Sequence, residues 1–217
     1  MSEYVMKRRE NYFWEKALAY MAKPLVLLLI HTPITPNMVT IFNFLVNIPI
    51  ICVLCWLKRP IWVAVFIQIY AYLDIVDGNL ARNKNMKSEL GRKLDIITDT
   101  IFYTVGVFFI GYFCCGELIW KVMLLIVIQQ IYGLIATFYI VPNMKKNESF
   151  LHTKLKAFFM KQGFIFGMDA IFQCLIMSLM LPFTFRRAIF IVCPILWIMD
   201  LVYRLYELKW VNRKRNK

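Results

Sequence analysis

Long apolar runs constrain the fold of this chain more than any other feature. A helix needs about 20 apolar residues to cross the hydrocarbon core of a bilayer. Because 60% of the 217 residues are apolar and the mean hydropathy is +0.60, the composition excludes a soluble globular domain. The sequence predicts an all-α integral membrane protein with six transmembrane helices, at roughly residues 38–57, 61–82, 94–115, 118–141, 163–181 and 186–206.

The segment before the first run mixes Lys and Arg with Tyr, Phe and Trp. This pattern favours an amphipathic helix on the membrane surface over a cleaved signal peptide. Thr35 and Pro36 are expected to cap and open the first span. We therefore expect a membrane-surface segment at 1–37, a six-helix domain at 38–206 and a basic cytoplasmic tail at 207–217.

The distribution of the 26 basic residues predicts the orientation in the membrane. Most of them fall on the side that carries both termini, whereas the other side carries only Lys58, Arg59, Lys121, Arg186 and Arg187. The positive-inside rule then places both termini in the cytoplasm, and we expect the protein in the inner (cytoplasmic) membrane of the cell. The net charge of +13 is spread over loops, which suits anionic membrane lipids, and we expect no nucleic-acid partner.

Four aspartates lie where the second and third runs meet the cytoplasm. Asp74 and Asp77 close one run, and Asp95 and Asp99 open the next. Their spacings place each pair on one helix face, so the two pairs can converge. Gathered carboxylates repel one another unless positive charge lies between them, and oxygen ligands favour hard divalent cations. Two such cations are a known device for displacement at phosphorus.

Small and basic residues accompany these aspartates. Gly78, Ala81 and Gly91 allow a bulky group to approach the backbone, and Arg82 offers a planar fork of donors that suits phosphate. The pattern Asp-x2-Asp-Gly-x2-Ala-Arg-x8-Gly-x3-Asp-x3-Asp is matched at every fixed position. It resembles the signature of the CDP-alcohol phosphotransferase (CDP-alcohol phosphatidyltransferase) family.

This resemblance implies an activity and a set of functional residues. The activity is transfer of a substituted phosphate from a CDP-linked donor to the hydroxyl of an acceptor, with release of CMP, in phospholipid biosynthesis. Asp99 would be the general base. Two divalent cations, Mg²⁺ or Mn²⁺, would be held by Asp74, Asp77, Asp95 and Asp99. The CDP pocket would be formed by Asn37, Thr40, Asp74, Gly78, Ala81, Arg82 and Gly91.

The resemblance leaves the substrates open. We favour CDP-diacylglycerol as donor and a small polar alcohol as acceptor. In the alternative, a CDP-linked small alcohol of the choline or ethanolamine type donates its headgroup to a lipid. A distant alternative is a cation transporter, because acids in membrane helices also form ion sites. The resemblance further implies a homodimer.

Other polar residues lie inside the predicted spans. Asp169 either binds a substrate hydroxyl or ammonium group or pairs with a basic side chain. Asp200 and Arg204 are expected to form a local pair. Interhelical hydrogen bonds or cavity-facing positions are expected for Asn43, Asn47, Gln129 and Gln130.

Overall fold

The computed structural model describes residues 13–140, 142–143 and 168–215. All of its described elements are helices, which confirms the all-α prediction. Within these residues, five helical stretches are long and apolar enough to cross a membrane: Pro36–Trp56, Pro60–Asn83, Glu89–Cys114, Ile119–Ile140 and Arg186–Trp210. The remaining predicted span, 163–181, lies partly outside the described residues. Its described helix, α10 (Ala170–Met180), is shorter than a span, so the count of six is not confirmed.

Several of these stretches contain π-helical turns. The helix α1 (Phe13–Ile30) precedes the first stretch, which consists of α2 (Pro36–Phe42), η1 (Asn43–Asn47) and α3 (Ile48–Trp56). The second is α4 (Pro60–Asn83), and the third joins α5 (Glu89–Ile101), η2 (Phe102–Gly106), α6 (Val107–Phe109) and η3 (Ile110–Cys114). Then follow α7 (Ile119–Ile135), η4 (Ala136–Ile140), η5 (Arg186–Ala188) and α11 (Ile189–Arg215). Each π-helical turn, η1 to η4, shifts which residues face a neighbouring helix.

Caps and turns set the ends of the helices near the aspartates. Thr35 accepts a hydrogen bond from the Met38 amide and Pro36 opens α2, as predicted. Ser88 caps α5 by accepting from the Gly91 amide at 3.0 Å, so this helix begins before the predicted residue 94. Its first turn is polar, and hydropathy alone does not detect a polar helical turn. Asn85, with φ of 55°, ends α4 in the left-handed conformation.

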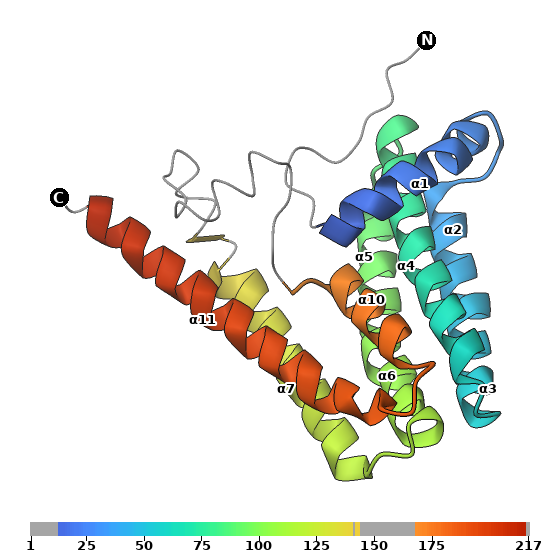
Figure 1. The fold of residues 1–217 in the computed structure, drawn as a ribbon. Coiled ribbons are helices and arrows are strands. Elements are labelled where there is room, and N and C mark those ends of the chain that lie inside the picture. The colour runs from blue at the N-terminus through green and yellow to red at the C-terminus, as the bar shows by residue number, and fades with distance from the viewer. Residues whose placement is uncertain (1–12, 141, 144–167, 216–217) are drawn as a thin grey trace.

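The helix α4 is the centre of the part of the bundle that carries the aspartates. Figure 1 shows α1 lying across α4 and α2 running beside α4, and α5 packs against α2. The Trp14 indole donates to Gln68 Oε1 at 3.0 Å, and Gln68 Nε2 donates to Ser178 Oγ at 2.8 Å, which connects α1, α4 and α10. The placement of residues 1–37 on the membrane surface stays a prediction.

Asparagines fasten the first stretch to α4. Asn43 Nδ2 donates to the Tyr70 carbonyl at 3.1 Å, and Asn47 Nδ2 donates to the Phe66 carbonyl at 3.3 Å. Both asparagines are buried. The predicted interhelical role of this pair is confirmed, and these bonds fix how α2 and η1 lie along α4.

The close packing of η3 against α7 and α11 predicts a stability effect at Gly111. A Cβ atom there would come within 2.7 Å of both Phe190 Cζ and Val122 Cγ2. Gly111→Ala should therefore lower the free energy of unfolding by about 1–3 kcal/mol, the cost of overpacking. Thermal unfolding of purified protein in one detergent measures the change.

The matched control is Gly133→Ala on α7, where a Cβ atom would meet nothing within 4 Å. This variant should unfold at or slightly above the temperature of the wild type, because Ala favours the helix over Gly. Equal unfolding temperatures for both variants would contradict the packing derived for Gly111.

Candidate active site

The aspartates lie at one end of the bundle, where α4 ends and α5 begins. Asp74, Asp95 and Asp99 each offer a carboxylate oxygen, and these oxygens lie within 4.8 Å of one another. The structure thus brings together three of the four aspartates that the sequence singled out. Oxygen ligands at this spacing fit a hard divalent cation such as Mg²⁺ or Mn²⁺.

Asp77 faces the neighbouring helix α2. Its side chain is buried, and its Oδ2 accepts a hydrogen bond from Thr40 Oγ1 at 2.6 Å. Thr40 therefore contacts a carboxylate, whereas the sequence placed it in the CDP pocket. Whether Asp77 shares in binding a cation, and whether Thr40 reaches CDP, stay predictions.

Asp99 is held by a residue that the sequence analysis missed. The Tyr70 hydroxyl on α4 donates to Asp99 Oδ1 at 2.6 Å. Tyr70 precedes Asp74 by one helical turn and therefore lies on the same face of α4. That spacing was available from the sequence, but one aromatic residue in an apolar run is most simply explained as core.

Arg82 lies against the glycine of its own motif. A Cβ atom on Gly78 would come within 3.6 Å of Arg82 Nη2, and the same nitrogen donates to Asn79 Oδ1 at 2.6 Å. Asn79 is 1% exposed, so this acceptor on α4 is buried. Ala81, beside Arg82, is partly exposed. Asn79 was also missed, because it occupies a variable position of the motif.

Gly91 allows α5 to approach the start of α2. A Cβ atom at residue 91 would come within 2.8 Å of Asn37 Oδ1, closer than real contacts allow. The structure thus places Asn37, predicted for the CDP pocket, directly beside Gly91. Any larger residue at 91 would have to displace the Asn37 side chain.

A lysine fastens the loop before α2 to the end of α4. Lys84 Nζ donates to the carbonyls of Thr32 and Ile34 at 2.7 and 2.8 Å. A cation at the C-terminus of a helix is also favoured by the helix dipole. Lys84 therefore fixes the entry to α2, which carries Asn37 and Thr40.

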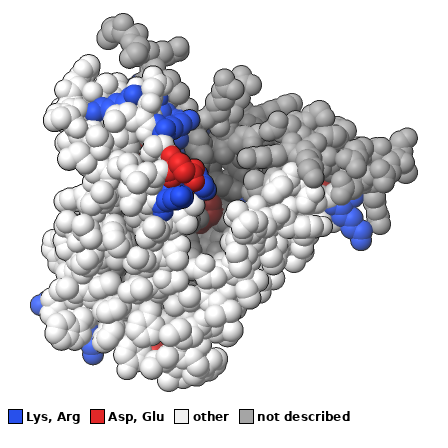
Figure 2. Space-filling model, turned by 180° about the vertical axis from the view of Figure 1, so that it is seen from behind, with Lys and Arg blue, Asp and Glu red and all other residues white. Residues whose placement is uncertain are grey.

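The surface around this end combines both signs of charge. Figure 2 shows acidic side chains at the edge of a hollow, with basic side chains directly beside them. Such a surface can receive a group that carries phosphates and bound cations, because the two signs complement both parts of it.

The remaining polar residues have structural partners. Asp169 was expected six residues inside a span, but it caps α10 by accepting from the Phe172 amide at 2.7 Å. Gln173 Nε2 donates to Gln129 Oε1 at 3.1 Å, as expected for an interhelical bond. Arg204 Nε donates to Asp200 Oδ2 at 2.6 Å, which confirms the predicted local pair.

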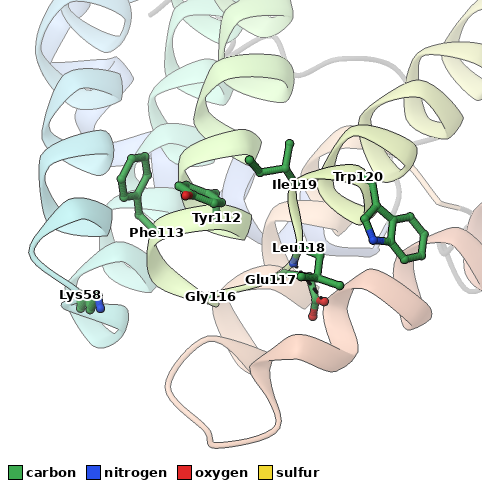
Figure 3. A pocket seen from close by; sticks show the side chains of 8 residues that line it. All are labelled: Lys58, Tyr112, Phe113, Gly116, Glu117, Leu118, Ile119 and Trp120. Carbon is green, nitrogen blue, oxygen red and sulfur yellow. Dashed lines mark hydrogen bonds between the residues drawn. The ribbon is translucent and has the colours of Figure 1, made fainter.

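A pocket of about 840 Å³ lies at the opposite end of α4. It is lined by Lys58, Tyr112, Phe113, Gly116, Glu117, Leu118, Ile119 and Trp120 (Figure 3). Glu117, the carboxylate in its lining, already pairs with Lys121 at 3.1 Å. The lining of this pocket therefore lacks a cluster of acidic side chains like that at the other end of α4.

Comparison with known proteins supports the motif. The model of a family described as CDP-alcohol phosphatidyltransferase matches residues 33–199, which include every residue predicted for the site. A search of curated proteins finds no match.

The bond between Thr40 and Asp77 predicts that the Thr40 hydroxyl stabilises the fold. Thr40→Val keeps the shape of the side chain but leaves the buried carboxylate without this donor. The free energy of unfolding should fall by about 1.5–3 kcal/mol, the range for hydrogen bonds to charged groups. Thermal unfolding checks this, with Thr40→Ser as the control that retains the hydroxyl. Equal losses in both variants would show that the methyl group, and not the hydrogen bond, matters.

Proposed function

Because the chain belongs to the CDP-alcohol phosphatidyltransferase family, we propose that it transfers a phosphatidyl group from CDP-diacylglycerol to a small polar alcohol, releasing CMP. Members of this family are phosphotransferases that move a phosphate-linked headgroup from a CDP-alcohol in phospholipid synthesis. The observation that carries the proposal is the convergence of Asp74, Asp95 and Asp99. Arg82 lies in the last turn of α4, the helix that carries Asp74.

The four aspartates provide the acidic ligands that this reaction requires. The family is generally dependent on divalent cations, and the oxygen-only donor set suits Mg²⁺ or Mn²⁺. In the proposal, Asp74, Asp77, Asp95 and Asp99 hold two such cations, which would supply positive charge to the phosphates of the donor.

Asp99 is the proposed general base. The acceptor hydroxyl attacks the phosphorus of the lipid-linked phosphate, a new phosphorus–oxygen bond forms, and the bond to the CMP phosphate breaks. Asp99 takes the proton of the attacking hydroxyl, and the negative charge leaves with CMP. Arg82 contributes a fixed cationic fork for the phosphates, held at Asn79.

The other predicted residues shape the pocket for CDP. Gly78 keeps its side of α4 open beside the Arg82 guanidinium, and Gly91 permits the approach of Asn37. Ala81 adds no bulk next to Arg82. Thr40 contributes through Asp77, the carboxylate to which it is bonded.

Asp169 bears on the choice of substrates. An acid free to bind an ammonium group would favour the alternative in which a choline- or ethanolamine-type CDP-alcohol donates to a lipid. One oxygen of Asp169 accepts the capping bond of α10, which supports a structural role. This favours CDP-diacylglycerol as donor. The proposal also keeps the active site and both termini in the cytoplasm, from the distribution of basic residues, and a homodimer, from the family resemblance.

The assay that tests the proposal follows CMP release by purified protein in lipid nanodiscs with Mg²⁺ or Mn²⁺. CDP-diacylglycerol is compared with CDP-choline and CDP-ethanolamine, each against a panel of acceptors. Release only from CDP-diacylglycerol supports the proposal, and release only from the small CDP-alcohols reverses the roles of lipid and headgroup. Ion movement across sealed vesicles without CMP release would favour the transporter.

Asp99→Asn should lower kcat by about 10²–10⁴-fold, because the amide cannot accept the proton that a general base removes. The control is Glu89→Gln, which removes a carboxylate from the same helix at an exposed position paired with Arg92. The control should retain wild-type turnover. An Asp99→Asn protein that folds and turns over normally would refute this assignment of the base.

Removal of divalent cations with EDTA should abolish CMP release, because the clustered carboxylates would then repel the phosphates of the donor. Addition of Mg²⁺ or Mn²⁺ in excess should restore it, as measured in the same assay. Full activity in EDTA after extensive dialysis would contradict the role proposed for the aspartates.

A further inference from the structure

We propose that Tyr70 is a positioning residue that aims the Asp99 carboxylate, so that Oδ2 faces the acceptor hydroxyl. This inference rests on the proposed function and assigns a task to a residue outside the family motif. Its basis is the hydrogen bond from the Tyr70 hydroxyl to Asp99 Oδ1, at 2.6 Å.

The bond joins the two helices that carry the aspartate pairs. Tyr70 lies on α4, one turn before Asp74, and Asp99 lies on α5. A change in the separation of these helices would therefore break the bond or turn the carboxylate. This bond therefore fixes the orientation of Asp99 relative to α4, the helix that holds Asp74 and Asp77.

Tyr70 is itself rigidly held. Its side chain is 1% exposed, and its ring stacks on Phe102 with centroids 3.9 Å apart and planes inclined by 15°. The ring of Tyr103 meets it edge-on at 6.4 Å. Its backbone carbonyl accepts from Asn43 Nδ2, so neither the ring nor the backbone can shift easily. A donor fixed in this way fixes its acceptor.

Without such a bond, the orientation of an aspartate carboxylate is only weakly restrained. The terminal torsion of Asp is broad, and rotation about it exchanges the two oxygens. The bond to Tyr70 occupies Oδ1 and leaves Oδ2 to accept a proton. Because reaction rates depend steeply on the geometry of the reacting groups, loss of this orientation should slow the chemical step more than it weakens binding.

A purely structural explanation makes a different prediction. A buried tyrosine hydroxyl needs some partner, and Asp99 would serve for that need alone. Tyr103 offers the matched comparison. It is buried in the same aromatic cluster, but its hydroxyl donates to the Ala170 carbonyl at 2.8 Å rather than to one of the clustered aspartates. Loss of either hydroxyl should lower stability, but only loss of the Tyr70 hydroxyl should affect turnover.

The test compares Tyr70→Phe with Tyr103→Phe in nanodiscs with Mg²⁺, following CMP release from CDP-diacylglycerol. Phe retains the stacked ring and removes the hydroxyl alone. Tyr70→Phe should lower kcat by about 10–100-fold, the usual effect of removing a group that orients a ligand or base, with little change in KM for the donor. Tyr103→Phe should retain both constants. Unchanged kcat in Tyr70→Phe, or equal losses in both variants, would overturn the inference.

A second measurement separates this inference from the proposed function. Mn²⁺ binding, followed by the loss of the electron paramagnetic resonance signal of free Mn²⁺, is compared for the wild type, Tyr70→Phe, Asp99→Asn and the double variant. If Tyr70 acts through Asp99, the Tyr70→Phe substitution should weaken Mn²⁺ binding when Asp99 is present and have no effect in the Asp99→Asn background. Equal effects in both backgrounds would overturn the inference.

The two failures are distinguishable. If the wild type releases no CMP from any CDP-linked donor, the proposed function fails, while the Mn²⁺ comparison still decides whether Tyr70 orients Asp99. If the wild type and Tyr103→Phe turn over and Tyr70→Phe matches them, the function stands and the inference fails.

Discussion

The mutual repulsion of carboxylates at one end of an apolar bundle is the constraint on which this structure depends. Oxygens of Asp74, Asp95 and Asp99 lie within 4.8 Å of one another. An ionised carboxylate only accepts hydrogen bonds, so its partners must be donors or cations. The chain supplies hydroxyl donors to two of the four aspartates, through Thr40 and Tyr70. Bound divalent cations are the complement that such a cluster calls for.

Short polar contacts hold the helices around this cluster. Asn43 and Asn47 bind carbonyls of α4, and Lys84 binds the loop before α2. The far end of the bundle combines close apolar packing, as at Gly111, with hydrogen bonds from Arg187 to the carbonyls of Cys115 and Gly116. Directed hydrogen bonds fix both orientation and distance, whereas apolar burial is non-directional. The polar contacts near the aspartates therefore fix the orientation of the helices that carry them.

The sequence predicted the helical class and the approximate ends of most spans, because hydropathy and capping residues act locally. It missed the polar first turns of α5, since a turn capped by Ser88 and rich in charge has no apolar signal. It placed Asp169 inside a span because apolar residues also precede this residue, which caps α10. The π-helical turns were also missed.

In the site, too, the sequence predicted features that depend on local spacing and missed those that depend on contacts between helices. Spacing along two helices predicted that the aspartate pairs could converge, and three of the four do. It could not show that Asp77 turns toward Thr40, or that a tyrosine reaches Asp99, because such bonds join residues that are distant in sequence. A hydrogen-bond partner across helices depends on rotation and separation, which a single sequence does not specify.

The motif fixes which acids and small residues are present, but the side chains that aim them lie outside its fixed positions. Tyr70 precedes the motif, and Asn79 occupies one of its variable positions while holding Arg82. Substitutions at such positions leave the pattern intact and yet alter the orientation of a base or of a phosphate-binding cation. Two chains with the same motif can therefore differ in rate, because the geometry of the reacting groups depends on residues that the motif does not include.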